Sequence, residues 1–133
     1  MKMLIQFAFV CLFVVTIHCA SVPKVWPAEQ EHALEKCSAE QNIDLELARK
    51  ILSHQAPAIN EQDKCLMSCY MKDTNAMVNH KVNWENIYES HIAHITNTKL
   101  KQKMKEIFKK CEAKMTYEGK DDCQIAYDAY NCQ

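Results

Sequence analysis

The sequence predicts an all-α protein of six short helices around an internal apolar cavity, cross-linked by three disulfides. Gly119 is the single glycine among 133 residues, and no run of alternating Val, Thr and Tyr predicts a strand. Apolar residues recur at helical spacing in several segments, and many of them are large and flexible, so we expect a centre that is not completely filled. The third observation is an even number of cysteines in a chain with an export signal, which is typical of a disulfide framework.

The export signal is at the N-terminus. Lys2 precedes an almost unbroken apolar run over residues 4–17, and small residues follow. This pattern predicts a secretory signal peptide over residues 1–20, with the cleavage site uncertain by one or two residues, because the run is too short for a membrane span. Cleavage would remove Cys11 and Cys19 and leave six cysteines in a single helical domain over residues 21–133, which we expect to be secreted and extracellular.

Two helices are expected in the first part of that domain. A Pro-punctuated arm carrying Trp26 leads to Pro27, which suits the first turn of a helix that runs to about Gln41. Asp44 is a suitable cap for a second, short helix that ends before Pro57.

The third helix, over residues 60–73, is the hub of the predicted fold. Asn60 is a plausible N-cap, and Asp63 can reach back to it in a capping box. Cys65 and Cys69 lie four residues apart and so share one face of the helix. They cannot easily pair with each other, so each is expected to tie the helix to a different segment. A polar connection without strands is expected over residues 74–82.

Three more helices are predicted from apolar stripes. After Asn83 as a cap, the fourth carries Trp84, Ile87, Tyr88, His91, Ile92 and Ile95. The stripe of the fifth comprises Leu100, Met104, Ile107, Phe108, Cys111 and Met115. A sixth helix opens at Asp121 with Gln124 and bears Cys123, Ala126, Tyr127 and Tyr130. Short helices of this kind depend on packing and cross-links for stability.

Several function classes are disfavoured. Without Lys2 the chain has fifteen basic and seventeen acidic residues, a net charge of −2, which gives no attraction to nucleic acid or an anionic membrane. His91 and His94 are three residues apart but lack a further ligand motif, so we expect no metal and no cofactor. The chain contains no Gly-x-Ser-x-Gly, His-Glu-x-x-His or Cys-Cys-x-x-His motif, so we do not expect an enzyme.

The six remaining cysteines are separated by 27, 3, 41, 11 and 8 residues. Six cysteines allow fifteen pairings, and the physics of the chain does not choose among them. The spacing resembles that of the insect odorant-binding proteins, the pheromone- and general-odorant-binding family, over essentially the whole mature chain. Segments that match its motifs are Lys36-Cys37, Cys65-Leu-Met-Ser-Cys69, and Cys123-Gln-Ile-Ala-Tyr127 through Cys132.

The resemblance implies a fold and a function. It implies the disulfides Cys37–Cys69, Cys65–Cys123 and Cys111–Cys132. It also implies a secreted carrier that binds small hydrophobic ligands such as odorants or pheromones and transports them through aqueous fluid to receptors. The implied partners are the ligand and a membrane odorant receptor complex, and we expect a monomer or a weak homodimer. Some members release ligand through an acidic tail after the last cysteine, whereas here only Gln133 follows, so that mechanism is not expected.

The candidate ligand-binding residues are large apolar, aromatic and polarizable side chains of the predicted helices. They are Leu52, Met67, Tyr70, Trp84, Tyr88, His91, Ile92, Leu100, Met104, Phe108 and Tyr127. Each of these residues could equally be a core residue. Tyr88, His91 and Tyr127 are the candidates for a polar contact with the ligand. If His91 is buried and neutral, its protonation would also provide a pH switch for ligand release.

Two alternative functions stay open. A secreted helical signalling or defence protein would act through its surface, and the candidate surface is the lysine face of the fifth helix, with Lys99, Lys101, Lys103, Lys105, Lys109 and Lys110. The same scaffold could also be a non-olfactory carrier of a lipid or hormone.

Overall fold

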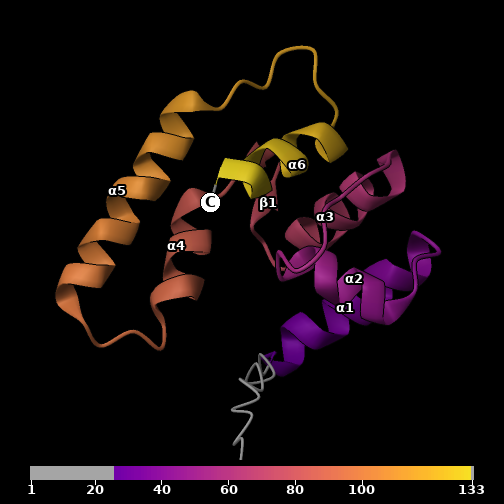
Figure 1. The fold of residues 1–133 in the computed structure, drawn as a ribbon. Helices are drawn as coiled ribbons and strands as arrows, with labels where there is room; N and C mark the ends of the chain where they lie inside the picture. The colour runs from indigo at the N-terminus through magenta and orange to yellow at the C-terminus, as the bar shows by residue number, and fades with distance from the viewer. Residues whose placement is uncertain (1–25, 133) are drawn as a thin grey trace, which may run out of the picture.

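The computed structural model describes residues 26–132, and for them it confirms the predicted all-α fold with six helices (Figure 1). The helices are α1 (Ala28–Glu40), α2 (Leu45–Leu52), α3 (Glu61–Asp73), α4 (Trp84–Ile92), α5 (Thr98–Lys114) and α6 (Asp122–Cys132). The predicted signal peptide over residues 1–20 lies outside the described residues.

Helices α1 and α2 pack against each other at one side of the molecule (Figure 1). Asp44 caps α2 as predicted, and its side chain accepts a hydrogen bond from the backbone N–H of Leu47 at 3.1 Å. Arg49 of α2 donates to Glu31 of α1, with 2.8 Å between Arg49 Nη1 and Glu31 Oε2. This two-pronged contact lowers the pKa of Glu31 from its ordinary value and joins the two helices.

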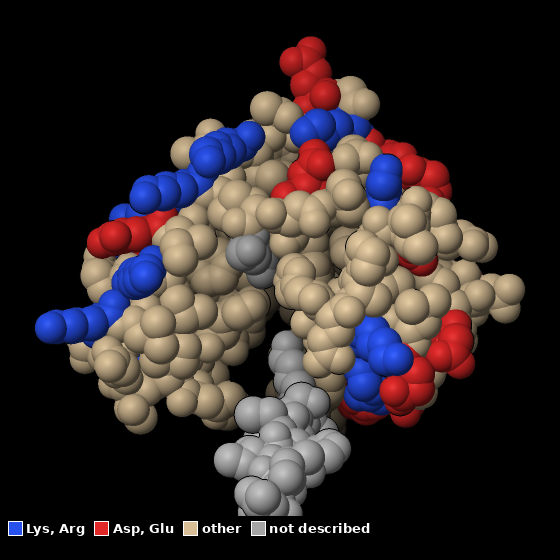
Figure 2. Space-filling model, in the orientation of Figure 1, with Lys and Arg blue, Asp and Glu red and all other residues tan. Residues whose placement is uncertain are grey.

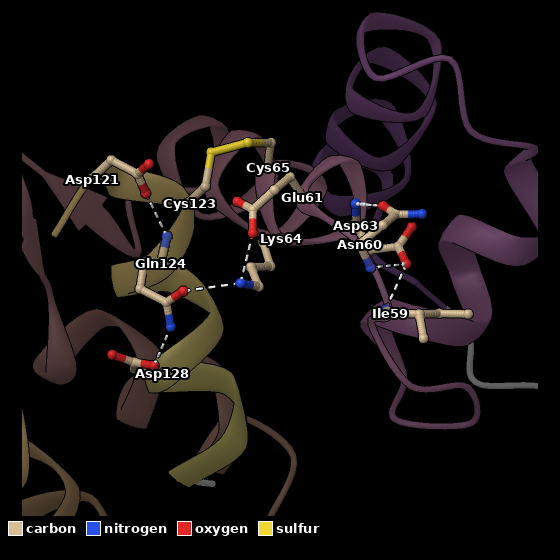
Figure 3. Close-up of polar contacts among 10 residues, drawn as sticks. All are labelled: Ile59, Asn60, Glu61, Asp63, Lys64, Cys65, Asp121, Cys123, Gln124 and Asp128. Atoms are coloured by element: carbon tan, nitrogen blue, oxygen red, sulfur yellow. Dashed lines mark hydrogen bonds and ion pairs between the residues drawn. A yellow bond between two sulfur atoms is a disulfide. The ribbon is translucent and has the colours of Figure 1, made fainter.

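Helix α3 begins with the predicted capping box (Figure 3). The Asn60 side chain accepts from the backbone N–H of Asp63 at 2.9 Å, and Asp63 Oδ2 accepts from the N–H of Asn60 at 3.3 Å. Asp63 Oδ2 also accepts from the N–H of Ile59 at 2.7 Å. Asp63 is buried, and these bonds satisfy a carboxylate that would otherwise be costly to bury.

Helix α3 packs most extensively against α6, which makes this pair the centre of the core. Leu66 of α3 and Ile125 of α6 are both fully buried. At the edge of the interface Lys64 Nζ donates to Gln124 Oε1 at 3.0 Å, beside the Cys65–Cys123 disulfide (Figure 3). The predicted hub helix is therefore joined to the last helix by both packing and a covalent bond.

The three disulfides of the structure have the pairing that the family resemblance implies. Cys37–Cys69 joins α1 to α3, Cys65–Cys123 joins α3 to α6, and Cys111–Cys132 joins α5 to α6. Each helix except α2 and α4 thus carries at least one half-cystine.

The expectation of a strand-free connection over residues 74–82 is wrong in one detail. Two short strands, β1 (Met77–Val78) and β2 (Lys81–Val82), form an antiparallel hairpin. Both residues of its turn have positive φ, 50° at Asn79 and 61° at His80, as a two-residue hairpin turn requires. Asn tolerates a positive φ. The second residue of such a turn is usually Gly, and because His80 has this position here, the sequence did not indicate a hairpin.

The hairpin is fixed to the start of α6 by an acidic side chain. His80 Nδ1 lies 2.5 Å from Asp122 Oδ1, and Lys72 at the end of α3 forms an ion pair with the other oxygen of Asp122. The hydrogen bonds from Lys72 and then from His80 lower the pKa of Asp122 below its ordinary value. One carboxylate therefore joins α3, the hairpin and α6.

Helices α4 and α5 pack mainly against each other and form an arm at the side of the molecule opposite α1 and α2 (Figure 1). Trp84 and Tyr88 of α4 both contact Phe108 of α5, with ring centroids 6.2 Å apart in each pair. Because α5 has one main helical neighbour, only a narrow face of it is covered. Leu100 and Ile107, expected to face inward, are therefore 45% and 40% exposed.

Candidate functional site

A cavity of about 1050 Å³ lies between α1, the C-terminal ends of α2 and α3, and α4. It opens to solvent between the α4–α5 arm and the α1–α2 side, where the space-filling view is deeply hollowed (Figure 2). The sequence predicts an internal apolar cavity. The observed cavity is open on one side and has polar as well as apolar walls.

The apolar part of the wall comes from several helices and from the segments before α1 and before β1. It includes Trp26, Leu52, Tyr70, Met71, Ala76, Ile87 and Tyr130. Trp26 and Tyr70 meet edge to face, with ring centroids 5.8 Å apart. The Tyr130 hydroxyl donates to the carbonyl oxygen of Leu52 at 3.0 Å. Burial raises the pKa of both tyrosines above the ordinary value, so their hydroxyl groups stay uncharged even in alkaline solution where an exposed tyrosine ionises.

One part of the polar wall is on α4 and just after it. Asn86, Ser90 and His94 recur at four-residue spacing and line the cavity, together with His91. The Ser90 hydroxyl donates to the carbonyl oxygen of Ile87 at 2.8 Å, and His91 Nδ1 lies 2.7 Å from the same oxygen. These bonds fix two polar side chains at the cavity wall.

The charged lining residues are acidic. Glu29 and Asp73 line the cavity, and Asp73 forms an ion pair with Lys36. No Lys or Arg is found among the described lining residues. The polar part is completed by Gln30, His32, His54, Thr74 and Asn75. The site therefore offers hydrogen-bonding groups but no permanent positive charge.

Three of the eleven predicted ligand-binding residues line this cavity, namely Leu52, Tyr70 and His91. The other eight lie elsewhere, and their contact with a ligand stays a prediction. Met67, Trp84 and Phe108 are buried in the core, Tyr88, Ile92, Met104 and Tyr127 are partly buried, and Leu100 is exposed.

The physical reason lies in the two faces of α4. Its apolar stripe, with Trp84 and Tyr88, packs on α5 at Phe108. The cavity instead lies on the neighbouring flank, with Ile87 and Ser90. Trp84 and Tyr88 of the predicted stripe therefore make a helix–helix contact, whereas Ile87 and His91 of the same stripe line the cavity.

The proposed pH switch at His91 required a buried imidazole. In the structure the His91 side chain is exposed and lies beside Phe108, with ring centroids 5.4 Å apart. The premise that His91 is buried is therefore wrong.

Several lining residues were not among the predicted site residues. They are Trp26, Met71, Ala76, Asn86, Ile87, Ser90, His94 and Tyr130, among others. Ile87 and Tyr130 belonged to the predicted apolar stripes, and Trp26 stood out in the arm before α1. No pattern in the sequence indicates that Ala76, Asn86 or Ser90 would line a cavity. Small and polar residues become lining residues only where the fold places their backbone beside the cavity.

Neither a metal site nor a membrane span emerges from the described part of the chain. Within residues 26–132 no group of three or more His, Cys, Asp or Glu side chains is placed to hold a metal ion. In the same residues no helix has the length and apolar character needed to cross a membrane.

The short helices, the three disulfides and the open, partly apolar cavity define a small helical protein of the odorant-binding type. The PBP/GOBP family model matches residues 22–133, and the chain belongs to that family. This is a family of binding and carrier proteins, so the chain is, in general terms, a small carrier of odorant- or pheromone-like molecules. Neither a curated protein nor a solved structure matches the chain.

Proposed function

We propose that the protein is a secreted carrier that binds a small hydrophobic ligand in the cavity between α1, α3 and α4 and transports it through aqueous fluid to a receptor. The observation that carries the proposal is the cavity itself, which has the size of a small-molecule site and an aromatic and aliphatic floor. Membership in the PBP/GOBP family supports binding of small hydrophobic ligands.

The side chains of the cavity wall also favour a particular chemical class of ligand. The Asn86 side chain can donate a hydrogen bond to a ligand oxygen atom, whereas the acidic Glu29 and the lack of Lys and Arg in the described lining disfavour a ligand carboxylate. A ligand with an apolar chain and one uncharged polar group, such as an alcohol, aldehyde or ester, fits this combination. About a dozen heavy atoms at roughly −0.6 kcal/mol each would give a dissociation constant near micromolar.

The function is tested by displacing a fluorescent apolar probe from the oxidised protein with a panel of alcohols, aldehydes, esters and carboxylates of matched chain length. We expect saturable one-to-one binding and displacement at micromolar concentrations, with the alcohols stronger than the carboxylates at neutral pH. Probe uptake that never saturates would contradict a carrier. Stronger binding of the carboxylates would contradict only the ligand class.

Ser90→Trp is expected to weaken ligand binding about tenfold. Ser90 is exposed at the cavity wall, so the indole can enter the open cavity without disturbing the core. Removing roughly 55 Å² of apolar contact from the ligand costs about 1.4 kcal/mol, which is a factor of ten in affinity. The measurement is the dissociation constant from probe displacement.

The matched control is Glu89→Trp, one residue earlier on α4. Glu89 is exposed and is not a lining residue, so its indole adds the same surface outside the cavity. We expect its affinity to stay within about twofold of the original protein. Equal affinities in the two tryptophan variants would place the ligand outside this cavity.

A further inference from the structure

Positive charge is segregated onto one helix. Helix α5 contains seven Lys and two Glu, a net charge of +5. The other described residues contain seven Lys or Arg and fifteen Asp or Glu, a net charge of −8. In Figure 2 the blue side chains follow the outer edge of α5, whereas blue and red side chains are mixed on the opposite side. Because these opposite charges largely cancel, the small net charge of the chain does not reveal that they lie on different parts of the molecule.

The lysines of α5 also differ from the other cations in their partners. Five of the seven other described cations form ion pairs, namely Lys36, Arg49, Lys64, Lys72 and Lys120. None of the seven α5 lysines forms an ion pair with any described residue. Their charge is therefore not neutralised within residues 26–132 and is directed to solvent.

The exposed side of α5 combines this charge with aliphatic side chains. At about 100° per residue, four lysines form one stripe along the helix, namely Lys99, Lys103, Lys110 and Lys114. Leu100 and Ile107, 45% and 40% exposed, lie between this stripe and the face that packs on α4. A helix surface with lysines beside exposed aliphatic residues is typical of segments that lie on a lipid headgroup layer.

We propose that the outer face of α5, formed by the four-lysine stripe with Leu100 and Ile107, docks on the surface of a membrane that contains anionic lipids. The lysines attract the negative headgroups, and the two aliphatic side chains enter the boundary between headgroups and acyl chains. The acidic remainder of the molecule is repelled by the same surface, so α5 is the side that faces the lipid. This docking does not depend on what the cavity binds.

The test is co-sedimentation of the oxidised protein with vesicles of phosphatidylcholine, with and without phosphatidylserine, at low and high salt. We expect binding only with phosphatidylserine, and weaker binding as salt rises. The double variant Lys103→Gln with Lys110→Gln should lower the partition coefficient about 30-fold, which corresponds to two lysines at roughly 1 kcal/mol each.

The matched control is Lys50→Gln with Lys81→Gln, which removes the same charge from α2 and β2. Both residues are exposed, and neither forms an ion pair with a described residue. We expect the control to bind within about twofold of the original protein. Equal losses in the two double variants, or equal binding to vesicles without phosphatidylserine, would overturn the proposal.

The aliphatic pair gives a second readout that distinguishes lipid from another acidic partner. Leu100→Ser with Ile107→Ser should lower the partition coefficient roughly tenfold while the dependence on salt is retained. Salt-sensitive self-association without vesicle binding would overturn the lipid assignment and would indicate that α5 contacts the acidic side of a second copy.

Discussion

Replacing Cys65 and Cys123 together by serine is expected to lower the free energy of unfolding by about 4 kcal/mol. The two cysteines are 58 positions apart, the longest separation among the three disulfides, so their bond restricts the unfolded chain most. The bond also joins α3 to α6, the two helices that pack most extensively against each other, at the edge of their interface. Such a loss is a large part of the net stability of a domain of this size.

The measurement is the free energy of unfolding from urea titrations, with the double variant Cys111→Ser and Cys132→Ser for comparison. These two cysteines are 21 positions apart, and their bond connects the α4–α5 arm to α6. We expect a smaller loss of about 3 kcal/mol, because the loop is shorter. A loss below about 1 kcal/mol in the Cys65 and Cys123 variant would contradict the hub role of α3.

Leu66→Ala is expected to lower the free energy of unfolding by about 3 kcal/mol. Leu66 is fully buried on α3, and its neighbours in the core include the fully buried Ile125 of α6. Truncation removes apolar contacts and leaves a space that the cross-linked helices cannot readily close.

The matched control for this truncation is Ile59→Ala. Ile59 directly precedes the N-cap of α3 and is 85% exposed, so the loss of its side chain removes little buried surface. We expect a change within about 0.5 kcal/mol. If both truncations destabilise the protein equally in urea titrations, the α3–α6 interface is not the stabilising centre described above.

The sequence predicts the order of the six helices and several of their N-terminal caps, but the fourth helix was expected to include Ile95, whereas α4 ends at Ile92. Asp44 and Asn60 are caps in the structure, because capping depends on residue type over a few positions. The hairpin was missed because its turn has His80 at a position where sequence reasoning looks for Gly. The exposure of Leu100 was also missed, since an apolar stripe shows which face can be buried but not how many neighbours cover it.

The cavity was less predictable than the fold. Leu52 and Tyr70, two of the predicted ligand-binding residues, line the cavity. Trp84 and Phe108, predicted for the same site, are not among its lining residues and contact each other. The wall formed by Asn86 and Ser90 depends on how the α4–α5 arm is placed across from α1, and that placement leaves no local pattern in the sequence.

The elements that stabilise the fold differ from those that form most of the proposed binding cavity. The α3–α6 pair and its disulfide hold the centre together, so the neighbouring cavity does not need to be filled for the fold to persist. The arm that forms the polar wall is attached at two places, through the hairpin before α4 and through the Cys111–Cys132 bond. The outward side of the same arm carries the lysine stripe of α5, so one element presents a wall to the ligand and a charged face to the surroundings.

The central claim is that a small hydrophobic ligand binds in the cavity between α1, α3 and α4. The most direct test is a titration of the isotope-labelled protein with a ligand from the displacement panel, followed by backbone amide chemical shifts. We predict saturable one-to-one changes that concentrate at cavity residues such as Leu52, Ala76 and Ser90. Changes that concentrate instead on the exposed face of α5, or that do not saturate, would contradict the claim.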